Sequence, residues 1–170
     1  MLNIDTLKQA LASFPSGVVI ATTLDPQGRP HGFTATSFSS VSIEPPLVLL
    51  CLARTAQCHE AFSGSQYVAI SLLGADGKAL AERFSTTVGT RKFEVPELIK
   101  GPHGLVLVQD AIASLVCVKR QMLTCGDHTI LINEVETVSN EPSREALIFY
   151  RRRYWLHDTS SDSFRRALQQ

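Results

Sequence analysis

The order of apolar and polar positions predicts a helix at the start of the chain, followed by short strands joined by turns. Four apolar residues recur at helical spacing before the first glycine: Ile4, Leu7, Leu11 and Phe14. This spacing predicts an amphipathic helix over residues 5–13, with Asn3 or Asp5 as its N-cap. Pro15 is expected to end the helix.

Runs of β-branched and apolar residues after this helix predict strands. These runs cover residues 18–23, 30–34, 47–52, 67–73, 113–123, 129–138 and 146–150. Turn residues at 25–28 and 124–128 are expected to join two pairs of runs into hairpins. The continuous apolar run 47–52 predicts a strand that is buried on both faces.

Two short helices are predicted between the strands. Residues 56–62 are expected to form one, with Thr55 as its N-cap, and residues 78–84 to form the other. Residues 85–110 carry no element that holds for long, and only residues 105–108 look briefly strand-like. A chain dominated by strands, several of them joined as hairpins, favours a mainly β protein. We expect a closed or nearly closed antiparallel barrel with peripheral helices.

Composition and charge narrow the class of protein. At 170 residues, with 44% hydrophobic and 19% charged residues, the chain is expected to form one globular domain with a sizeable core. Lys and Arg together number 16, as do Asp and Glu, so the net charge provides no drive toward nucleic acid or a membrane surface. No apolar run approaches the ~20 residues of a membrane span, and no signal-peptide pattern is present. A cytoplasmic location is therefore expected.

The cysteines do not predict a metal site. Four are scattered along the chain without a close pair: Cys51, Cys58, Cys117 and Cys125. Cys51 and Cys117 lie in apolar runs and are expected to be reduced core residues. His59 and His128 are further candidate ligands. However, no zinc-type spacing occurs, and the adjacency of Cys58 and His59 suits chelation poorly.

The most unusual segment is the hydroxyl-rich stretch 32–42, which contains Thr34, Thr36 and Ser37 and runs into a predicted strand. It carries more hydrogen-bonding groups than an ordinary strand needs. One interpretation is a strand end and loop that hold a planar polar ligand. The other is a solvated hairpin rim, because Ser and Thr are common in turns.

Two basic segments suit a phosphate group. Arg54 precedes the predicted helix 56–62, where free backbone N–H groups would add to its positive charge. The alternative is an exposed Arg beside a routine helix cap. Arg91, Lys92 and Phe93 lie in the long connection and are suited to contact a phosphate or the face of a ring.

Three motifs together resemble the short-chain flavin reductases, the small reductase components of two-component flavin-dependent monooxygenases. They are Phe14-Pro15-Ser16-Gly17-Val18, the stretch from Gly32 to Val48, and Gly126-Asp127-His128 in a late hairpin turn. The motifs occur in the family's order and at fitting distances. The similarity covers about residues 7–157.

The resemblance implies a fold, cofactors and partners. It implies a mainly β domain over residues 1–157, a split β-barrel of the antiparallel Greek-key type. Residues 158–170 lie outside the resemblance, and their run of Ser and Asp predicts a flexible tail. The resemblance further implies binding of FMN or FAD, NADH or NADPH as the electron donor, a homodimer, and a separate flavin-dependent monooxygenase that receives the reduced flavin. Because hydride would pass between two cofactors, no protein nucleophile or acid–base residue is required.

The resemblance also implies the residues of the site. The equivalents of Thr34–Ser37 hold the flavin ring and ribityl chain, while Cys51–Gln57 and the basic loop hold its phosphate end. The candidate flavin-binding residues are Thr34, Ala35, Thr36, Ser37, Cys51, Ala53, Arg54, Thr55, Gln57, Lys92 and Phe93. His128 is expected to contact the nicotinamide, with a water-facing turn residue as the alternative. Tyr154 is a second candidate for that pocket, and a core or dimer-interface position suits it equally.

Two positions depart from the family pattern. Gly77 stands where a Gln usually begins the short helix, and Ser16 replaces a more usual Thr. Three functions remain open at this point: an NAD(P)H:flavin oxidoreductase, a protein that holds flavin tightly and oxidises another small molecule, and a non-catalytic flavin carrier or interaction module. The hydroxyl-rich stretch favours the first two, and the Gly126-Asp127-His128 turn favours the first.

Overall fold

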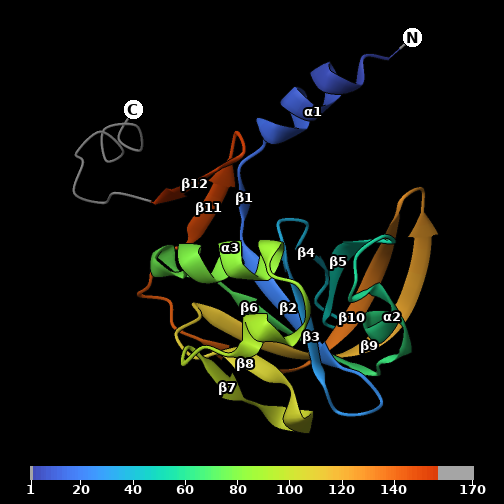
Figure 1. Ribbon diagram of the computed structural model, residues 1–170, viewed down its shortest axis with the longest axis vertical. Coiled ribbons are helices and arrows are strands. Elements are labelled where there is room, and N and C mark those ends of the chain that lie inside the picture. Colours follow the sequence, from blue (N-terminus) through green and yellow to red (C-terminus); the bar gives the residue numbers. More distant parts are fainter. Residues whose placement is uncertain (1, 157–170) are drawn as a thin grey trace.

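The computed structural model describes residues 2–156, which form a curved antiparallel sheet with helices around it (Figure 1). The α-helices of this part are α1 (Ile4–Ala12), α2 (His59–Gly64) and α3 (Lys78–Thr86). The 3-10 helices are η1 (Ala75–Gly77), η2 (Gly89–Phe93) and η3 (Pro102–Gly104). The tail predicted for residues 158–170 lies outside the described residues.

The strands belong to three sheets, and all pairs are antiparallel. The main sheet has the order β3-β2-β6-β9-β10-β5-β4, a second sheet has the order β1-β11-β12, and β7 pairs with β8. The strands are β1 (Ser16–Gly17), β2 (Val19–Leu24), β3 (Pro30–Ala35), β4 (Ser39–Ser42), β5 (Leu47–Ala53), β6 (Tyr67–Leu72), β7 (Leu98–Lys100), β8 (Val106–Val108), β9 (Ala113–Cys125), β10 (His128–Asn140), β11 (Leu147–Tyr150) and β12 (Arg153–Leu156).

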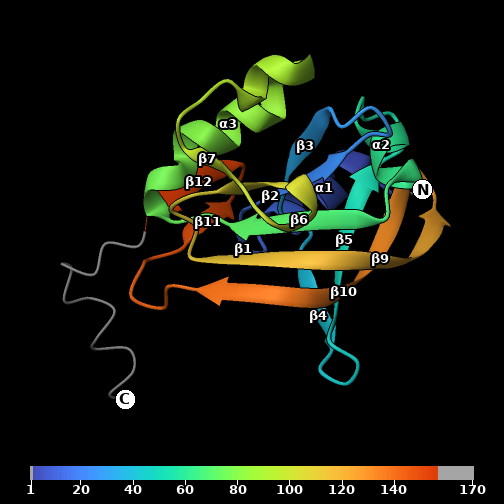
Figure 2. The same ribbon diagram turned by 90° about the horizontal axis from the view of Figure 1, so that it is seen from below.

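The main sheet has Greek-key connections. β6, β9 and β10 are neighbours in the sheet in that order, whereas β5, which precedes them in the chain, lies on the other side of β10 (Figure 2). This return of an earlier strand to the end of the row defines the Greek key. The prediction of a mainly β, antiparallel Greek-key sheet with peripheral helices is confirmed.

The two ends of the main sheet do not pair with each other. β3 forms one edge, and β4 with β5 forms the other. Residues of β3 and β5 nevertheless line one common cavity, because the sheet curves until its ends approach. The sheet is therefore a barrel with a split between β3 and β5.

β2 is buried on both faces because an apolar cluster lies on each side of it. Val19 and Ala21 belong to the cluster enclosed by the curved sheet. Ile20 belongs to a second cluster, in which Leu80 and Phe84 of α3 cover the sheet from outside. The predicted helix over residues 78–84 is confirmed, and it is held by this second cluster.

α1 is present as predicted, but none of its residues is buried. Asn3 is the N-cap, since its Oδ1 accepts from the N–H groups of Asp5 (2.9 Å) and Thr6 (3.0 Å). The apolar side of the helix remains in contact with water, and Leu11 is 66% exposed. Among the described residues, no helix has the length and apolar character needed to span a membrane.

Two predictions near β5 are wrong. Only one face of β5 is buried, through Val48, Leu50 and Leu52, because the enclosed core meets its inner face alone. α2 begins at His59, with Cys58 as an N-cap that makes no side-chain cap bond. Thr55 is therefore not a helix cap, and the residues before α2 form turns.

Several short strands are not predicted from the sequence, among them β1, β4, β7 and β12. β8 falls within residues 105–108, which look briefly strand-like in the sequence, but its partner β7 has only three residues, which is too short to show a period. β12 follows β11 after a turn of only two residues, Arg151 and Arg152, in place of the Asn-Gly type of turn that marks such hairpins in a sequence.

Candidate functional site

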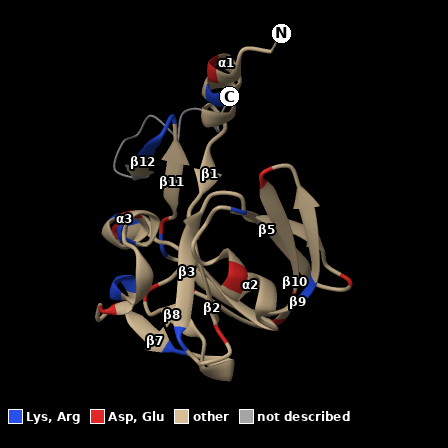
Figure 3. Cartoon of the chain, turned by 45° about the vertical axis from the view of Figure 1, so that its right-hand side comes forward, with Lys and Arg blue, Asp and Glu red and all other residues tan. Residues whose placement is uncertain are grey.

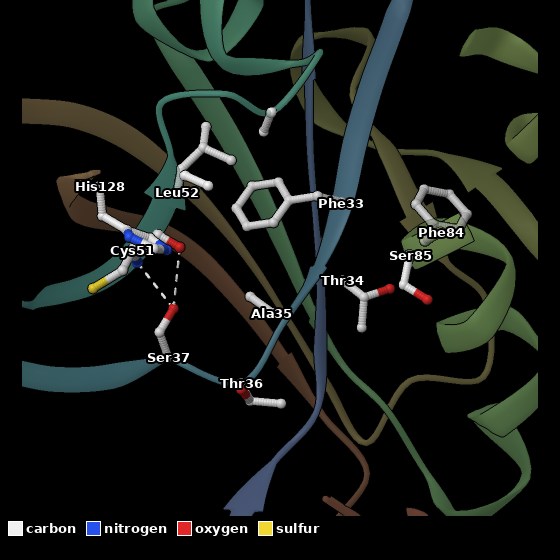
Figure 4. Close-up of a pocket in the computed structure, with 12 residues that line it drawn as sticks. Phe33, Thr34, Ala35, Thr36, Ser37, Cys51, Leu52, Phe84, Ser85 and His128 are labelled. Carbon is white, nitrogen blue, oxygen red and sulfur yellow. Dashed lines mark hydrogen bonds between the residues drawn. The ribbon is translucent and has the colours of Figure 1, made fainter. Parts of the chain in front are cut away.

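A cavity of about 380 Å³ lies at the split between β3 and β5. The end of α3 and the first residue of β10 also reach it. Figure 4 shows Ser37, Cys51 and His128 on one side of the cavity and Thr34 and Phe84 on the other. The site thus joins four segments that are far apart in the sequence.

Most of the candidate residues meet at this cavity. Seven of them line it: Thr34, Ala35, Thr36, Ser37, Cys51, Ala53 and His128. Arg54, Thr55 and Gln57 are exposed in the turn after β5 and do not line it. Because α2 begins only at His59, Arg54 does not stand beside a helix start, and its contact with a phosphate group stays a prediction.

Two of the lining hydroxyl groups are bonded to the protein itself. Thr34 Oγ1 donates to the carbonyl oxygen of Ala81 in α3 (2.6 Å). Ser37 Oγ accepts from the N–H of Cys51 (2.9 Å) and donates to the carbonyl oxygen of Cys51 (3.3 Å). These bonds tie β3 to α3 and the following loop to β5, so the hydroxyls fix the separation of the cavity walls.

The backbone of β3 presents unpaired groups on the side of the split. The carbonyl of Arg29 accepts from the N–H of Asp25 across the hairpin (3.0 Å), so Arg29 points toward β2. The N–H and C=O groups of successive residues point to alternate sides of a strand. Those of Gly32 and Thr34 therefore point away from β2, to the free edge. The carbonyl of Gly32 indeed accepts from Lys92 there (3.2 Å).

Lys92 and Phe93 lie behind the cavity wall and do not line the cavity. Lys92 Nζ donates to the carbonyl oxygens of Gly32 and Phe84 (3.4 Å for the latter) and lies 5.8 Å from the centroid of the Phe84 ring. Phe93 packs edge-on against Phe84 at 5.1 Å. Burial lowers the pKa of Lys92, against an opposing effect of the Cys58 thiol. The geometry gives Lys92 and Phe93 the role of supporting Phe84.

His128 is fixed by its neighbour in the sequence. It is the first residue of β10, opposite Ala53 of β5. Its Nδ1 lies 2.8 Å from Asp127 Oδ1, and this hydrogen bond, together with the charge of His128, lowers the pKa of Asp127. An ionised Asp127 accepts a hydrogen bond from Nδ1–H, which leaves Nε2 of His128 to meet a ligand in the cavity.

Tyr154 does not line the cavity and is not brought together with His128. Its ring packs edge-on against Phe149 at 5.1 Å, in the apolar cluster beneath α3. Burial, followed by the charge of Glu82, raises the pKa of Tyr154. Tyr154 is thus partly buried against this cluster, and its contact with a nicotinamide or with a second copy of the chain stays a prediction. Gly77 is the N-cap of α3 and does not line the cavity either.

Five lining residues are not singled out by the sequence-based prediction, although the first three lie in its segments 32–48 and 51–57: Phe33, Leu52, Ala56, Phe84 and Ser85. Phe33 had a sequence signal, since it stands between Gly32 and Thr34 in the hydroxyl-rich stretch. Phe84 and Ser85 end a helix that is easily predicted, but no local pattern shows that this helix end meets β3.

The cavity can hold a flat ligand. Its lining combines aromatic rings, small apolar side chains, hydroxyl groups, the Cys51 thiol and His128, without a carboxylate or an ammonium group among the described residues. Within residues 2–156, no group of three or more His, Cys, Asp or Glu side chains is arranged to hold a metal ion.

An open antiparallel barrel with such a cavity at its split defines a protein that binds and orients a flat cofactor. Residues 11–155 match the family model of the flavin reductase like domain. The match covers most of the chain, and the chain belongs to this family.

Individual relatives agree with this assignment. The chain is 39% identical over 148 residues to a protein named actinorhodin polyketide dimerase from Streptomyces coelicolor, covering 87% of this chain and 83% of the relative. The solved NADH:FAD oxidoreductase SgcE6 of Streptomyces globisporus C-1027, in complex with NAD and FAD fragments, is 32% identical with a TM-score of 0.87, covering 94% of this chain and 96% of that one.

A second solved structure is that of BorF, the flavin reductase component of a bacterial two-component tryptophan halogenase. It is 27% identical with a TM-score of 0.83, covering 91% of this chain and 98% of that one. The predicted flavin reductase split barrel is confirmed by these neighbours.

Proposed function

We propose that the protein is an NAD(P)H:flavin oxidoreductase. It transfers a hydride from NADH or NADPH to FMN or FAD and releases the reduced flavin to a separate flavin-dependent monooxygenase. The observation that carries this proposal is the cavity at the split of the barrel, in a chain of the flavin reductase-like family. The cavity has aromatic walls and an open polar strand edge.

The residues of the cavity fit a flavin. The pyrimidine edge of the flavin ring system alternates acceptors with one donor, and the free-edge N–H and C=O of Thr34 supply the complementary pair. The rings of Phe33 and Phe84 limit the cavity on its apolar side. When bound, the flavin supplies the electron-accepting atoms. The protein positions the ring and keeps one face open for the nicotinamide.

His128 is suited to hold the nicotinamide. Asp127 fixes its tautomer, so that the neutral ring presents Nε2 as an acceptor for the carboxamide N–H of NADH or NADPH. This contact would orient the donor ring without taking part in the hydride transfer itself. The remaining face of the cavity is open, which suits two ligands that must arrive and leave in turn.

The proposed partner enzyme is inferred from the chemistry of the product, the reduced flavin. A reduced flavin that leaves the cavity reacts with oxygen, and it is useful to a second enzyme that activates oxygen on it. BorF is the reductase component of such a two-component system. We extend this arrangement to the present chain and propose a separate monooxygenase as the acceptor of its reduced flavin.

We also propose that the protein is a homodimer. The outer face of β5 and β10 carries a row of partly exposed apolar side chains: Leu47, Leu49, Ile130 and Ile132. α1 adds an apolar side of its own, which nothing in the described chain covers. A second copy placed on these surfaces would remove them from water, as homodimer interfaces do.

The oligomeric state is tested by light scattering during size-exclusion chromatography. We expect a mass of twice 18.6 kDa for the native chain and a shift to the monomer for Ile132→Asp. Val88→Asp, which also charges an exposed apolar position, should leave the mass unchanged. A native monomer would contradict the homodimer.

The location proposed is the cytoplasm, where nicotinamide nucleotides are kept and cysteines stay reduced.

The activity is tested by following the absorbance of NADH after addition of free FMN or FAD to the purified protein, and by repeating the assay with NADPH. We expect rapid oxidation that depends on added flavin. A yellow protein that keeps its flavin through purification and leaves NADH unchanged would contradict the proposal. That result would favour a tight flavin-binding protein or a carrier.

A further inference from the structure

The turn between β11 and β12 has an unusual backbone for its sequence. Tyr150 pairs with Arg153, so the turn consists of Arg151 and Arg152 alone. Both have left-handed conformations, with φ of 49° and 61°. Two-residue hairpin turns of this kind strongly favour Asn and Gly, because longer side chains strain the backbone there. Non-glycine residues held in such conformations concentrate at functional sites.

The arginines of this turn carry positive charge that the described part of the chain does not neutralise. Arg151, Arg152 and Arg153 are exposed, and none of them forms an ion pair with a carboxylate of residues 2–156. By contrast, Arg120 pairs with Glu134 at 2.7 Å. Figure 3 marks the turn between β11 and β12 as a basic segment.

A second cavity, of about 280 Å³, lies beside this turn. It is lined by the two turn arginines and by the C-terminal end of α1: Gln9, Ala12, Ser13, Arg151 and Arg152. The N–H of Arg151 donates to the carbonyl oxygen of Ala12 (2.8 Å), which fixes the turn against the helix. This cavity shares no lining residue with the cavity at the split of the barrel.

Aromatic rings flank the charged turn. The guanidinium of Arg151 lies 5.1 Å from the centroid of the Tyr150 ring. The indole N–H of Trp155 donates to the carbonyl oxygen of Tyr150 (3.0 Å), and half of the Trp155 surface is exposed. Arginine side chains next to exposed aromatic rings recognise phosphate groups and flat bases.

The arginines are not needed to neutralise the end of α1. Cations near a helix C-terminus stabilise its free carbonyl groups. Here the carbonyls of Ala10, Leu11 and Ala12 already accept backbone N–H groups, from Ser13, Phe14 and Arg151. The carbonyl groups at the end of α1 therefore do not require the two guanidinium groups as partners.

We propose that the turn Arg151–Arg152 and the end of α1 form a second ligand site, which binds the phosphate group of a nucleotide. The site is separate from the cavity of the proposed flavin chemistry, and it does not depend on that function. The arginines provide charge-assisted hydrogen bonds to the phosphate oxygens, and Tyr150 and Trp155 offer ring surface to a base.

The only tryptophan of the chain reports on this site. We suggest titrating the full-length protein, without flavin and at low ionic strength, with ADP, inorganic pyrophosphate and adenosine while recording Trp155 fluorescence. ADP is expected to give a saturable change, and adenosine alone none. Tighter binding of ADP than of pyrophosphate supports a site that contacts the base as well as the phosphate. Equal binding supports a site that contacts the phosphate alone.

Arg152→Gly separates ligand binding from a structural role. Glycine adopts the left-handed conformation freely, so this variant should melt at a higher temperature than the native protein. It should also bind ADP about tenfold more weakly, since one charge-assisted contact is lost. Lys100→Met removes an exposed positive charge from β7, at the other end of the molecule in Figure 1, and should leave ADP affinity unchanged.

Three results would overturn the proposal. The first is the absence of a saturable fluorescence change with both ADP and pyrophosphate. The second is an equal loss of affinity in Arg152→Gly and Lys100→Met, which would indicate attraction by general charge only. The third is an Arg152→Gly protein that melts earlier but binds ADP as before, which would show that the arginine only holds α1.

Discussion

The ammonium group of Lys92 donates to the carbonyl oxygen of Gly32 at 3.2 Å, and this bond joins η2 to the free edge of β3. The same Nζ lies 3.4 Å from the carbonyl oxygen of Phe84 at the end of α3. One side chain thus holds together two walls of the cavity. It occupies the edge carbonyl of Gly32 and leaves the edge groups of Thr34 for a ligand.

The first prediction concerns the edge N–H of Thr34. Thr34→Pro removes this donor, and a proline whose nitrogen faces the free edge of an edge strand is tolerated. The variant should fold, while its KM for flavin rises about 3- to 10-fold through the lost hydrogen bond. The measurements are circular dichroism and steady-state NADH oxidation at several flavin concentrations.

Two control variants make this test specific. Thr34→Ala removes only the hydroxyl bond to Ala81 and separates the side chain from the backbone. Ala35→Pro removes an N–H that points toward β2 and should prevent stable folding, because a ladder bond is lost. If Thr34→Pro and Ala35→Pro both unfold, the assignment of the free edge is wrong.

The second prediction concerns the closeness of β2 and β3 at Gly32. A Cβ atom at this position would lie 2.8 Å from the carbonyl oxygen of Ala21, a backbone atom that cannot move away alone. Gly32→Ala should therefore destabilise the fold by about 1–3 kcal/mol. Gly17→Ala is the matched control, since a Cβ at Gly17 meets no atom within 4 Å. Urea unfolding of both variants measures the difference, and equal stability would contradict the close approach.

The third prediction concerns His128 and Asp127. His128→Ala should raise the KM for NADH about 3- to 10-fold, the effect of one lost hydrogen bond, with a smaller change in the KM for flavin. Asp127→Ala removes the acceptor of the hydrogen bond from Nδ1–H and should reproduce part of this effect. Unchanged kinetics in His128→Ala would exclude this histidine from the nicotinamide site.

The fourth prediction concerns stability and pH at the β2–β3 turn. Burial alone would raise the pKa of Asp25, but hydrogen bonds from Arg29, His31 and Gln27 outweigh it and hold the pKa well below the usual range. A carboxylate whose pKa is lower in the folded state stabilises the protein above its unfolded pKa of about 4, and the contribution is lost as the pH falls further.

Asp25→Asn should therefore be less stable than the native chain near neutral pH, and the difference should shrink as the pH falls below about 4. Urea unfolding at a series of pH values measures it. A difference that stays constant over this range would show that the ionised carboxylate of Asp25 does not contribute to stability.

The sequence predicted the components of the fold better than their arrangement. α3 and the strands of the main sheet show clear periods, because side chains that face a core repeat every two or every 3.6 residues. α2 was misplaced by about one turn, since Thr55 and Ala56 look like a helix start but are held in turns by backbone bonds between Ala56 and Ala53 and between His59 and Ala56.

For the cavity, too, the sequence predicted several of the residues but not the contacts between them. Thr34, Ser37 and His128 were predicted at the site through their motifs, and all three line it. The hydrogen bonds of the Thr34 and Ser37 hydroxyls could not be predicted from the sequence. Their acceptors belong to α3 and β5, which meet these residues only through tertiary contact. Arg54 and Lys92 were expected to bind phosphate, and the structure places neither in the lining.

The sequence by itself determined most of the main strands, the long hairpins, and the presence of α1 and α3, since these follow from local periodicity and turn chemistry. Only the tertiary structure decided that β4 joins the main sheet, that the end of α3 meets β3, that Lys92 supports the wall from behind, and that Tyr154 packs against the cluster beneath α3. These choices depend on the curvature of the sheet and on packing between segments far apart in the chain, which no local pattern of residues encodes.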